Sequence, residues 1–157
     1  MLFIPKFFLN LSSRSFNNNV VCLGEQLIKV VLVLREILPI HFWMGADVDA
    51  SPNNLVREFS SFNFKIIGED QNLIDLAENT DQFLSGVFIA IEGNEITDIK
   101  SDAAGSTEDE PFRGLDLINV LIEIRAFDTT AFEIYSESLA IIEKLSSHFN
   151  EPIQTKK

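Results

Sequence analysis

The sequence predicts an α+β fold: a single domain in which helices pack on a mixed or antiparallel sheet. The chain has 157 residues, about the length of one domain, and such a chain buries enough surface to hold a core without disulfides or metals. Fourteen phenylalanines and an apolar fraction of 46% supply that core. Segments with strand-like alternation and segments with helical periodicity follow one another without an internal repeat, which is typical of α+β domains.

The first 43 residues differ from the rest of the chain in charge and form an apolar N-terminal segment. Residues 1–43 carry four basic and two acidic side chains, whereas the remainder carries 8 basic and 22 acidic ones. Within the segment, residues 20–38 predict a mostly buried helix with Glu25 and Lys29 at pairing distance. The valine-rich run 28–34 also fits a buried strand. A different explanation of the charge step is that translation starts later, for example at Met44. The intact mass of the protein made from its native locus would test this hypothesis.

Residues 44–150 form the predicted acidic α+β domain, which opens on a strand. Ser51 and Pro52 are typical of a helix N-cap and first helical position, so they predict a short amphipathic helix at 52–62. The next predicted elements are a strand at 64–68, a helical turn or two at 72–80 and a hairpin at 83–96. The first strand of this hairpin is apolar on both faces, so we expect it to be central and covered on both sides.

The C-terminal third has the most regular pattern. It predicts strands at 118–127 and 131–135, a tight turn at 128–130 and a helix that ends at residue 149. Glu123 and Arg125 mark the face of the first strand that we expect to lie nearer to water. Ser136 is the expected cap of the helix, and residues 151–157 are the expected frayed tail.

Composition excludes several classes of function. The net charge of −12 disfavours nucleic-acid binding and attachment to anionic membranes, and it favours a basic protein partner. The same charge also serves solubility. With Cys22 as the one cysteine and two histidines, the chain lacks disulfide, zinc and Cys/His nucleophile patterns. We therefore expect a cytoplasmic protein without a cofactor.

The stretch "GADVDASPNN" (45–54) places Asp47 and Asp49 at the end of a strand. A calcium loop would use Asp47, Asp49, Ser51, Asn53 and Glu58 as ligands. Its sharp turn, however, needs glycine where the chain has Pro52. An apolar strand followed by Asp-x-Asp also resembles the haloacid dehalogenase-like signature, in which one aspartate attacks phosphorus with magnesium present. We favour a plain strand end followed by a helix cap, and so expect no metal and no catalytic residue.

The run 98–114 has few side chains to bury and predicts a long exposed acidic loop. Long loops of this kind are commonly functional, and its carboxylates would suit a basic partner. The expected partner-binding residues are Asp98, Asp102, Glu108, Asp109 and Glu110. The alternative is a solvated loop that only maintains solubility.

The stretches "GADVDASPNNLVREF" and "VLIEIRAFDTTAFEIYSESLAIIEKL" resemble segments of the immunity proteins that bacteria pair with polymorphic or contact-dependent toxins. This resemblance implies a non-enzymatic inhibitor that covers the active face of a basic toxin, such as a nuclease. Two other classes remain open. One is a magnesium-dependent phosphohydrolase that uses Asp47 and Asp49, and the other is a structural domain that self-associates into a homo-oligomer through residues 1–43.

Overall fold

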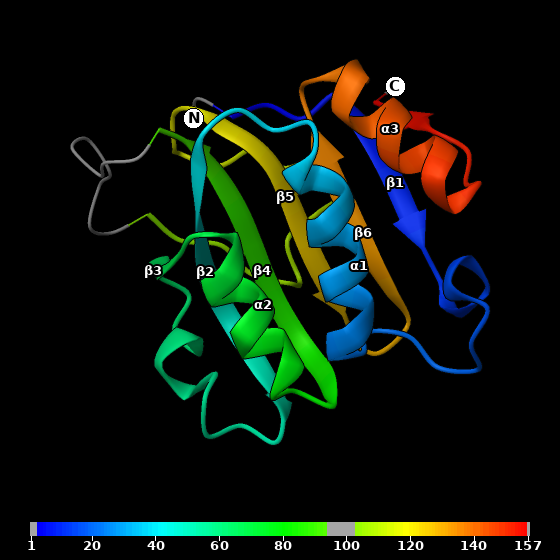
Figure 1. Ribbon diagram of the computed structural model, residues 1–157. Coiled ribbons are helices and arrows are strands. Elements are labelled where there is room, and N and C mark those ends of the chain that lie inside the picture. Colours follow the sequence, from blue (N-terminus) through cyan, green and yellow to red (C-terminus); the bar gives the residue numbers. More distant parts are fainter. Residues whose placement is uncertain (1–2, 94–102, 157) are drawn as a thin grey trace.

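The described part of the chain, residues 3–93 and 103–156 of a computed structural model, is a seven-stranded antiparallel sheet with three α-helices on one face (Figure 1). The strand order is β3 (Lys65–Gly68), β2 (His41–Ser51), β4 (Gln82–Glu92), β5 (Val120–Phe127), β6 (Ala131–Ser136), β1 (Phe7–Leu11) and β7 (Gln154–Thr155). The helices are α1 (Gly24–Arg35), α2 (Asp70–Glu78) and α3 (Leu139–Phe149), with short 3-10 helices η1 (Ser13–Phe16) and η2 (Arg57–Phe59). The α+β single-domain prediction is confirmed.

The main core lies between the helices and the sheet. Leu27 and Leu34 of α1 are fully buried there, as are Phe88 and Ala90 of β4. These positions follow the helical spacing of α1 and the two-residue alternation of β4, so each element turns one apolar row to the other. None of the described helices has the length and hydropathy needed to cross a bilayer.

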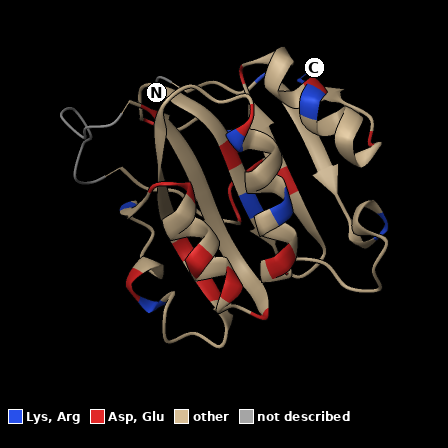
Figure 2. Cartoon of the chain, in the orientation of Figure 1, with Lys and Arg blue, Asp and Glu red and all other residues tan. Residues whose placement is uncertain are grey.

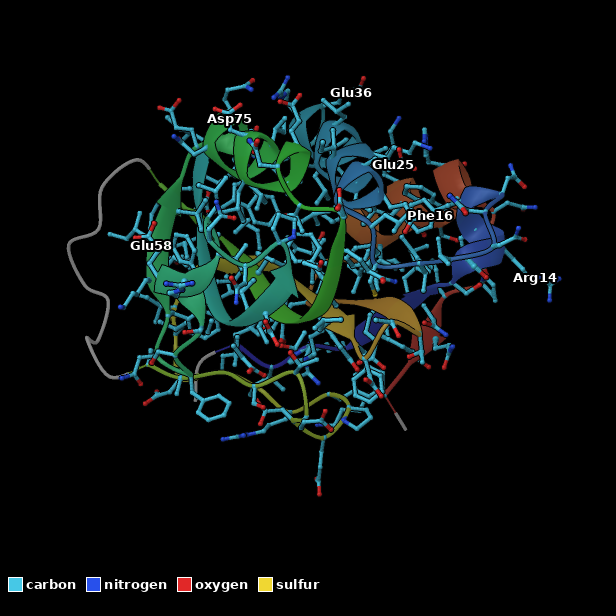
Figure 3. All side chains as sticks on the ribbon, turned by 90° about the horizontal axis from the view of Figure 1, so that it is seen from below. Arg14, Phe16, Glu25, Glu36, Glu58 and Asp75 are labelled. Atoms are coloured by element: carbon cyan, nitrogen blue, oxygen red, sulfur yellow. The ribbon has the colours of Figure 1, made fainter. Side chains whose placement is uncertain are left out.

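The second face of the sheet is covered by residues 103–119, which we call the cover segment. Its Ala103, Leu115 and Leu117 are buried against Val87 and Ile89 of β4. Figure 3 shows the helices above the sheet and this segment below it. The prediction of an exposed loop at 98–114 is therefore only partly right for its described residues, 103–114: Glu108 and Glu110 are exposed, whereas Ala103 and Thr107 are buried by tertiary contacts.

β4 is the central strand that the sequence predicts, since helices cover one face and the cover segment the other. Residues 86–91 are all buried. The prediction of a local hairpin at 83–96 is wrong in one respect. β4 pairs with β2 along one edge and with β5 along the other, so strands from elsewhere in the chain occupy both of its edges. The expected return strand at 94–96 lies outside the described residues.

The expected boundary after residue 43 falls inside β2 and marks no boundary in the fold. β1 lies between β6 and β7, and α1 packs against α2 and α3. The helix predicted within residues 20–38 is α1, and no ion pair joins Glu25 to Lys29, both of which are described. The N-terminal residues thus supply part of the sheet and part of its helical layer.

Three further predictions fail near the ends of strands. Ser51 pairs with Gln82 as the last residue of β2, so it cannot cap a helix, and only η2 is helical within 52–62. The expected frayed tail instead contains β7, in which Thr155 pairs with Phe7. The C-terminal strands and turn are confirmed, while the cap of α3 is Ser138, whose hydroxyl accepts from Ile141 N–H, rather than Ser136.

Candidate functional site

The acids expected to bind a partner differ in their surroundings. Glu108 and Glu110 are exposed on the cover segment. Asp109 is half-buried, forms an ion pair with Arg113 and accepts a hydrogen bond from Ser106 N–H at 3.1 Å, so its carboxylate is already engaged. Asp98 and Asp102 lie outside the described residues. Of the predicted partner-binding acids that are described, Glu108 and Glu110 are therefore the two whose side chains are exposed and form no ion pair with a described residue.

Asp47 holds the cover segment to the sheet. It lies at an irregularity in the pairing of β2 with β4 and has a positive φ of 52°. Its Oδ2 accepts from Thr107 N–H at 2.8 Å and from the Ser106 hydroxyl at 3.3 Å. Its own N–H donates to the Ser61 carbonyl at 2.7 Å, and its carbonyl accepts from the Ser85 hydroxyl at 2.7 Å. The residue is therefore a structural anchor.

Asp49 does not join Asp47 in a shared site. It is exposed, two residues further along β2, whereas the Asp47 carboxylate points to the cover segment. The strand continues to Ser51, so these residues do not wrap around a common point as the ligands of a calcium loop must. Among the described residues, no three acidic, histidine or cysteine side chains form a group that could hold a metal ion.

The anchoring role of Asp47 predicts a stability difference between the two aspartates. Asp47→Gly removes the carboxylate at a positive φ that glycine adopts freely, and we expect a loss of about 1–3 kcal/mol of unfolding free energy because buried donors lose a charged acceptor. Asp49→Ala, at the exposed position, should change it by less than about 0.5 kcal/mol. Chemical denaturation measures both. Equal effects would contradict the assignment, and hydrogen exchange at the Thr107 amide should rise only in Asp47→Gly.

Glu123 and Arg125 form a buried ion pair under the cover segment. Both side chains are 0% exposed, and Arg125 Nε donates to Glu123 Oε2 at 2.8 Å. Arg125 Nη1 also donates to the Asp109 carbonyl at 2.8 Å, and the guanidinium lies 4.6 Å from the centroid of the Tyr135 ring. The expectation that this face lies nearer to water is wrong, because the cover segment closes over it.

The buried ion pair shifts the titration of its surroundings. Burial raises the pKa of Glu123, against the lowering effect of the Arg125 guanidinium. Burial also raises the pKa of Glu133, the cross-strand neighbour of Arg125. Among the described residues, Glu123 Oε1 and Arg125 Nη2 have no hydrogen-bond partner. Few polar groups around the pair compensate for its burial. Removal of either side chain would therefore leave the other as an unpaired buried charge, which carries a large desolvation penalty.

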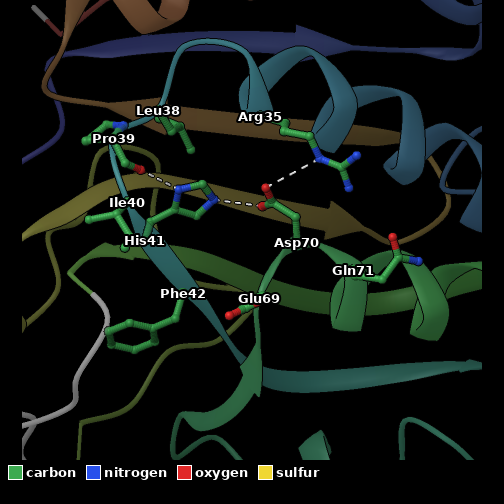
Figure 4. Close-up of a pocket in the computed structure, with 9 residues that line it drawn as sticks. All are labelled: Arg35, Leu38, Pro39, Ile40, His41, Phe42, Glu69, Asp70 and Gln71. Carbon is green, nitrogen blue, oxygen red and sulfur yellow. Dashed lines mark hydrogen bonds and ion pairs between the residues drawn. The ribbon is translucent and has the colours of Figure 1, made fainter.

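A cavity of about 520 Å³ opens where the end of α1, the start of β2 and the start of α2 meet (Figure 4). Asp70, in the first turn of α2, accepts on Oδ1 from both His41 Nε2 and Trp43 Nε1, each at 2.7 Å. Its Oδ2 lies 3.6 Å from Arg35 Nε. His41 Nδ1 lies 2.6 Å from the Pro39 carbonyl. A histidine beside an aspartate is a common catalytic arrangement, but none of the residues that line this cavity is a serine, threonine or cysteine nucleophile.

Three exposed carboxylates line a surface groove of about 400 Å³ between the start of α1 and the end of α2, which we call the acidic groove. They belong to Glu25, Glu78 and Asp81, and none takes part in an ion pair with a described residue. Figure 2 shows acidic positions along α2 and at the start of α1, and in Figure 3 the labelled Glu25 and Asp75 belong to the same helical layer. Between residues 66 and 92 the chain has six acidic residues and no lysine or arginine.

Close backbone packing brings the groove together. The Gly24 N–H donates to the Asp81 carbonyl at 3.2 Å. A Cβ atom on Gly24 would lie 2.1 Å from the carbonyl oxygens of both Ala77 and Thr80, so glycine alone permits this approach. Sequence reasoning missed the groove because Glu25 lies more than fifty residues from Glu78.

Cys22 is a core residue. It is fully buried, and its thiol contacts the Ala131 carbonyl at 3.2 Å. Burial raises the pKa of Cys22 to about 12, so the reactive thiolate is strongly disfavoured.

Comparisons of the chain with models of protein families, with curated proteins and with solved structures found no match.

Proposed function

We propose that this protein binds a basic partner protein and inhibits it by covering its cationic face, as immunity proteins do with toxic nucleases. The observation that carries the proposal is the acidic groove: Glu25, Glu78 and Asp81 line one concave surface without counter-charges from described residues. Carboxylates that have no structural ion pair remain available to a partner.

The lining of the groove fits a lysine or arginine side chain. Its walls include the apolar side chains of Ile28 and Ala77, which suit the methylene stem of such a residue. The C-terminal end of α2 contributes partial negative charge at the same place, which favours a cation. A basic side chain would thus find apolar contact along its stem and carboxylates at its charged end.

The charge of the whole chain supports association with a basic surface. At a net charge of −12 the protein attracts a cationic partner over distances set by ionic strength. The cover segment lies on the face of the sheet opposite the helices, and its exposed Glu108 and Glu110 add to this long-range attraction. We assign contact to the groove and only steering to Glu108 and Glu110.

Two charge-matched variants test this assignment. Glu78→Gln/Asp81→Asn and Glu108→Gln/Glu110→Gln each remove two negative charges. The partner is first isolated with tagged protein at low and moderate salt, and association and inhibition of its activity are then measured with each variant. We expect the groove variant to lower the association rate roughly tenfold and to speed dissociation, while the cover-segment variant changes the rate less and leaves dissociation unaltered.

These measurements show whether the partner contacts the acidic groove or the cover segment. Equal effects of the two variants would show that net charge alone matters, and a larger effect of Glu108→Gln/Glu110→Gln would move the contact to the cover segment. A partner that binds without losing activity would contradict inhibition itself. The phosphohydrolase alternative requires magnesium-dependent hydrolysis that disappears in Asp49→Asn, and the contacts of Asp47 within the fold count against that alternative.

A further inference from the structure

His41 has hydrogen-bond acceptors at both of its ring nitrogens. Nδ1 lies 2.6 Å from the Pro39 carbonyl, and Nε2 lies 2.7 Å from Asp70 Oδ1 (Figure 4). A carbonyl and an ionised carboxylate only accept hydrogen bonds, so both contacts are made together only when both ring nitrogens carry hydrogen. The side chain is 7% exposed, so water competes little for either contact.

We propose that His41 is a proton-dependent lock that holds the start of α2 against β2 and the linker that follows α1. The imidazolium donates to Pro39 in the linker and to Asp70 in the first turn of α2. The neutral ring has one N–H, so its loss of a proton turns one of the two contacts into a repulsion between lone pairs. Histidine is the side chain whose free form exchanges this proton between about pH 5 and 8, so the test of the lock covers that range.

The charged groups near His41 come from α2, β4 and α1. From α2 and its N-cap, Asp70 and Glu69 face the cavity, and from β4 Glu92 is the cross-strand partner of His41. From α1, Arg35 is the opposing cation, but its Nε lies 3.6 Å from Asp70 Oδ2, so Asp70 stands between it and the imidazole. Asp70 is thus the carboxylate in direct contact with His41, and the one nearby guanidinium is itself paired with Asp70.

The sign of the pH dependence follows from these contacts. The lock needs hydrogen on both ring nitrogens of His41, so its contribution to stability is present at low pH and is lost when rising pH removes one of them. If the proposed function holds, the lock also regulates the acidic groove, since α2 carries Glu78 at its other end; the test below does not require a partner.

Trp43 provides a built-in reporter. It is the one tryptophan in the chain, its Nε1 donates to the same Asp70 oxygen as His41, and the two rings lie edge to face with centroids 5.9 Å apart. Tryptophan emission should therefore shift in a single transition as His41 titrates. The experiment records emission of the full chain from about pH 5 to 9, above the ordinary range of carboxyls.

A matched control comes from the second histidine. His148 is exposed on α3, so His148→Gln should leave the transition unchanged, whereas His41→Gln should abolish it. A transition that survives in His41→Gln, or that is absent from the unmodified protein, would overturn the lock. Ring nitrogen chemical shifts of the unmodified protein give a measurement that needs no variant: below the transition both nitrogens of His41 should carry protons, and observation of a neutral ring there would overturn the proposal.

Discussion

A protein that begins at Met44 is expected not to fold. Residues 1–43 supply β1, α1 and the first residues of β2. Without them β6 and β7 lose the strand that joins them, and α2 and α3 lose their shared neighbour. The purified truncation should show no cooperative thermal transition by circular dichroism; this method is needed because the truncation also removes Trp43.

A pair of identical substitutions within α1 tests the same dependence more gently. Leu27 is fully buried and Leu32 is 44% exposed on one helix. Leu27→Ala should lower the unfolding free energy by about 2–5 kcal/mol, since it removes contacts and leaves a cavity, whereas Leu32→Ala should cost less than about 1 kcal/mol. A stable, cooperative protein from Met44 onward, or equal effects of the two leucine variants, would show that residues 1–43 are an appendage after all.

This dependence also bears on self-association. Loss of a dimer on removal of residues 1–43 would not identify an interface, because the truncation is expected to remove the fold as well. A test of self-association must instead change exposed residues and leave the core intact. Ile40, which is 66% exposed beside the His41 cavity, is one such position.

Local pattern predicted much of this fold. The alternation in β4, β5 and β6 and the spacing of apolar residues in α1 and α2 are properties of short segments, and each of these elements is present where the sequence places it. The predictions fail where contacts between residues far apart in the sequence determine the local structure. Ser51 has the chemistry of a helix cap, yet pairing with Gln82 keeps it in β2. Ala103, Leu115 and Leu117 have no common period and are buried only because a sheet face lies beneath them.

The candidate sites were harder to predict for the same reason. Sequence reasoning singled out acids that are close together in the chain, such as Glu108 and Glu110. The acidic groove and the His41–Asp70 contact instead join residues from different elements, the latter pair 29 positions apart. The charges of Glu123 and Arg125 stand out in an apolar strand, but their alternation identifies a face without saying whether that face is covered.

Single replacements within the buried ion pair are expected to have unequal effects. Glu123→Leu leaves the Arg125 guanidinium buried without its carboxylate, and arginine cannot lose its proton at accessible pH. We expect a loss of about 3–5 kcal/mol of unfolding free energy, measured by chemical denaturation. Arg125→Met leaves Glu123, which can escape the penalty by taking up a proton, so its effect should depend strongly on pH.

The direction of that dependence follows from the raised pKa of Glu123. Burial raises it, and Arg125 is the main group that opposes the rise, so Arg125→Met should raise it further. A carboxyl with a raised folded pKa contributes stability below its ordinary range, and this contribution is lost as the pH rises through the folded value. Arg125→Met should therefore be destabilised more at about pH 8 than at about pH 5, where uptake of a proton is easier. A flat difference between the two conditions would contradict a further rise in the pKa of Glu123.

The double variant Glu123→Leu/Arg125→Met separates the value of the pair from the penalty of breaking it. It removes both charges and replaces them with apolar side chains, and such replacements of buried ion pairs are often close to neutral. Arg125 also donates to the Asp109 carbonyl at 2.8 Å, so about 1 kcal/mol should remain as the cost of that hydrogen bond. If the double variant is as unstable as Glu123→Leu, the ion pair itself holds the cover segment on the sheet. If the double variant recovers most of the unfolding free energy that Glu123→Leu loses, apolar contacts of Leu115 and Leu117 hold the cover segment on the sheet. The two charges would then contribute mainly to the register of the segment on the strands beneath it.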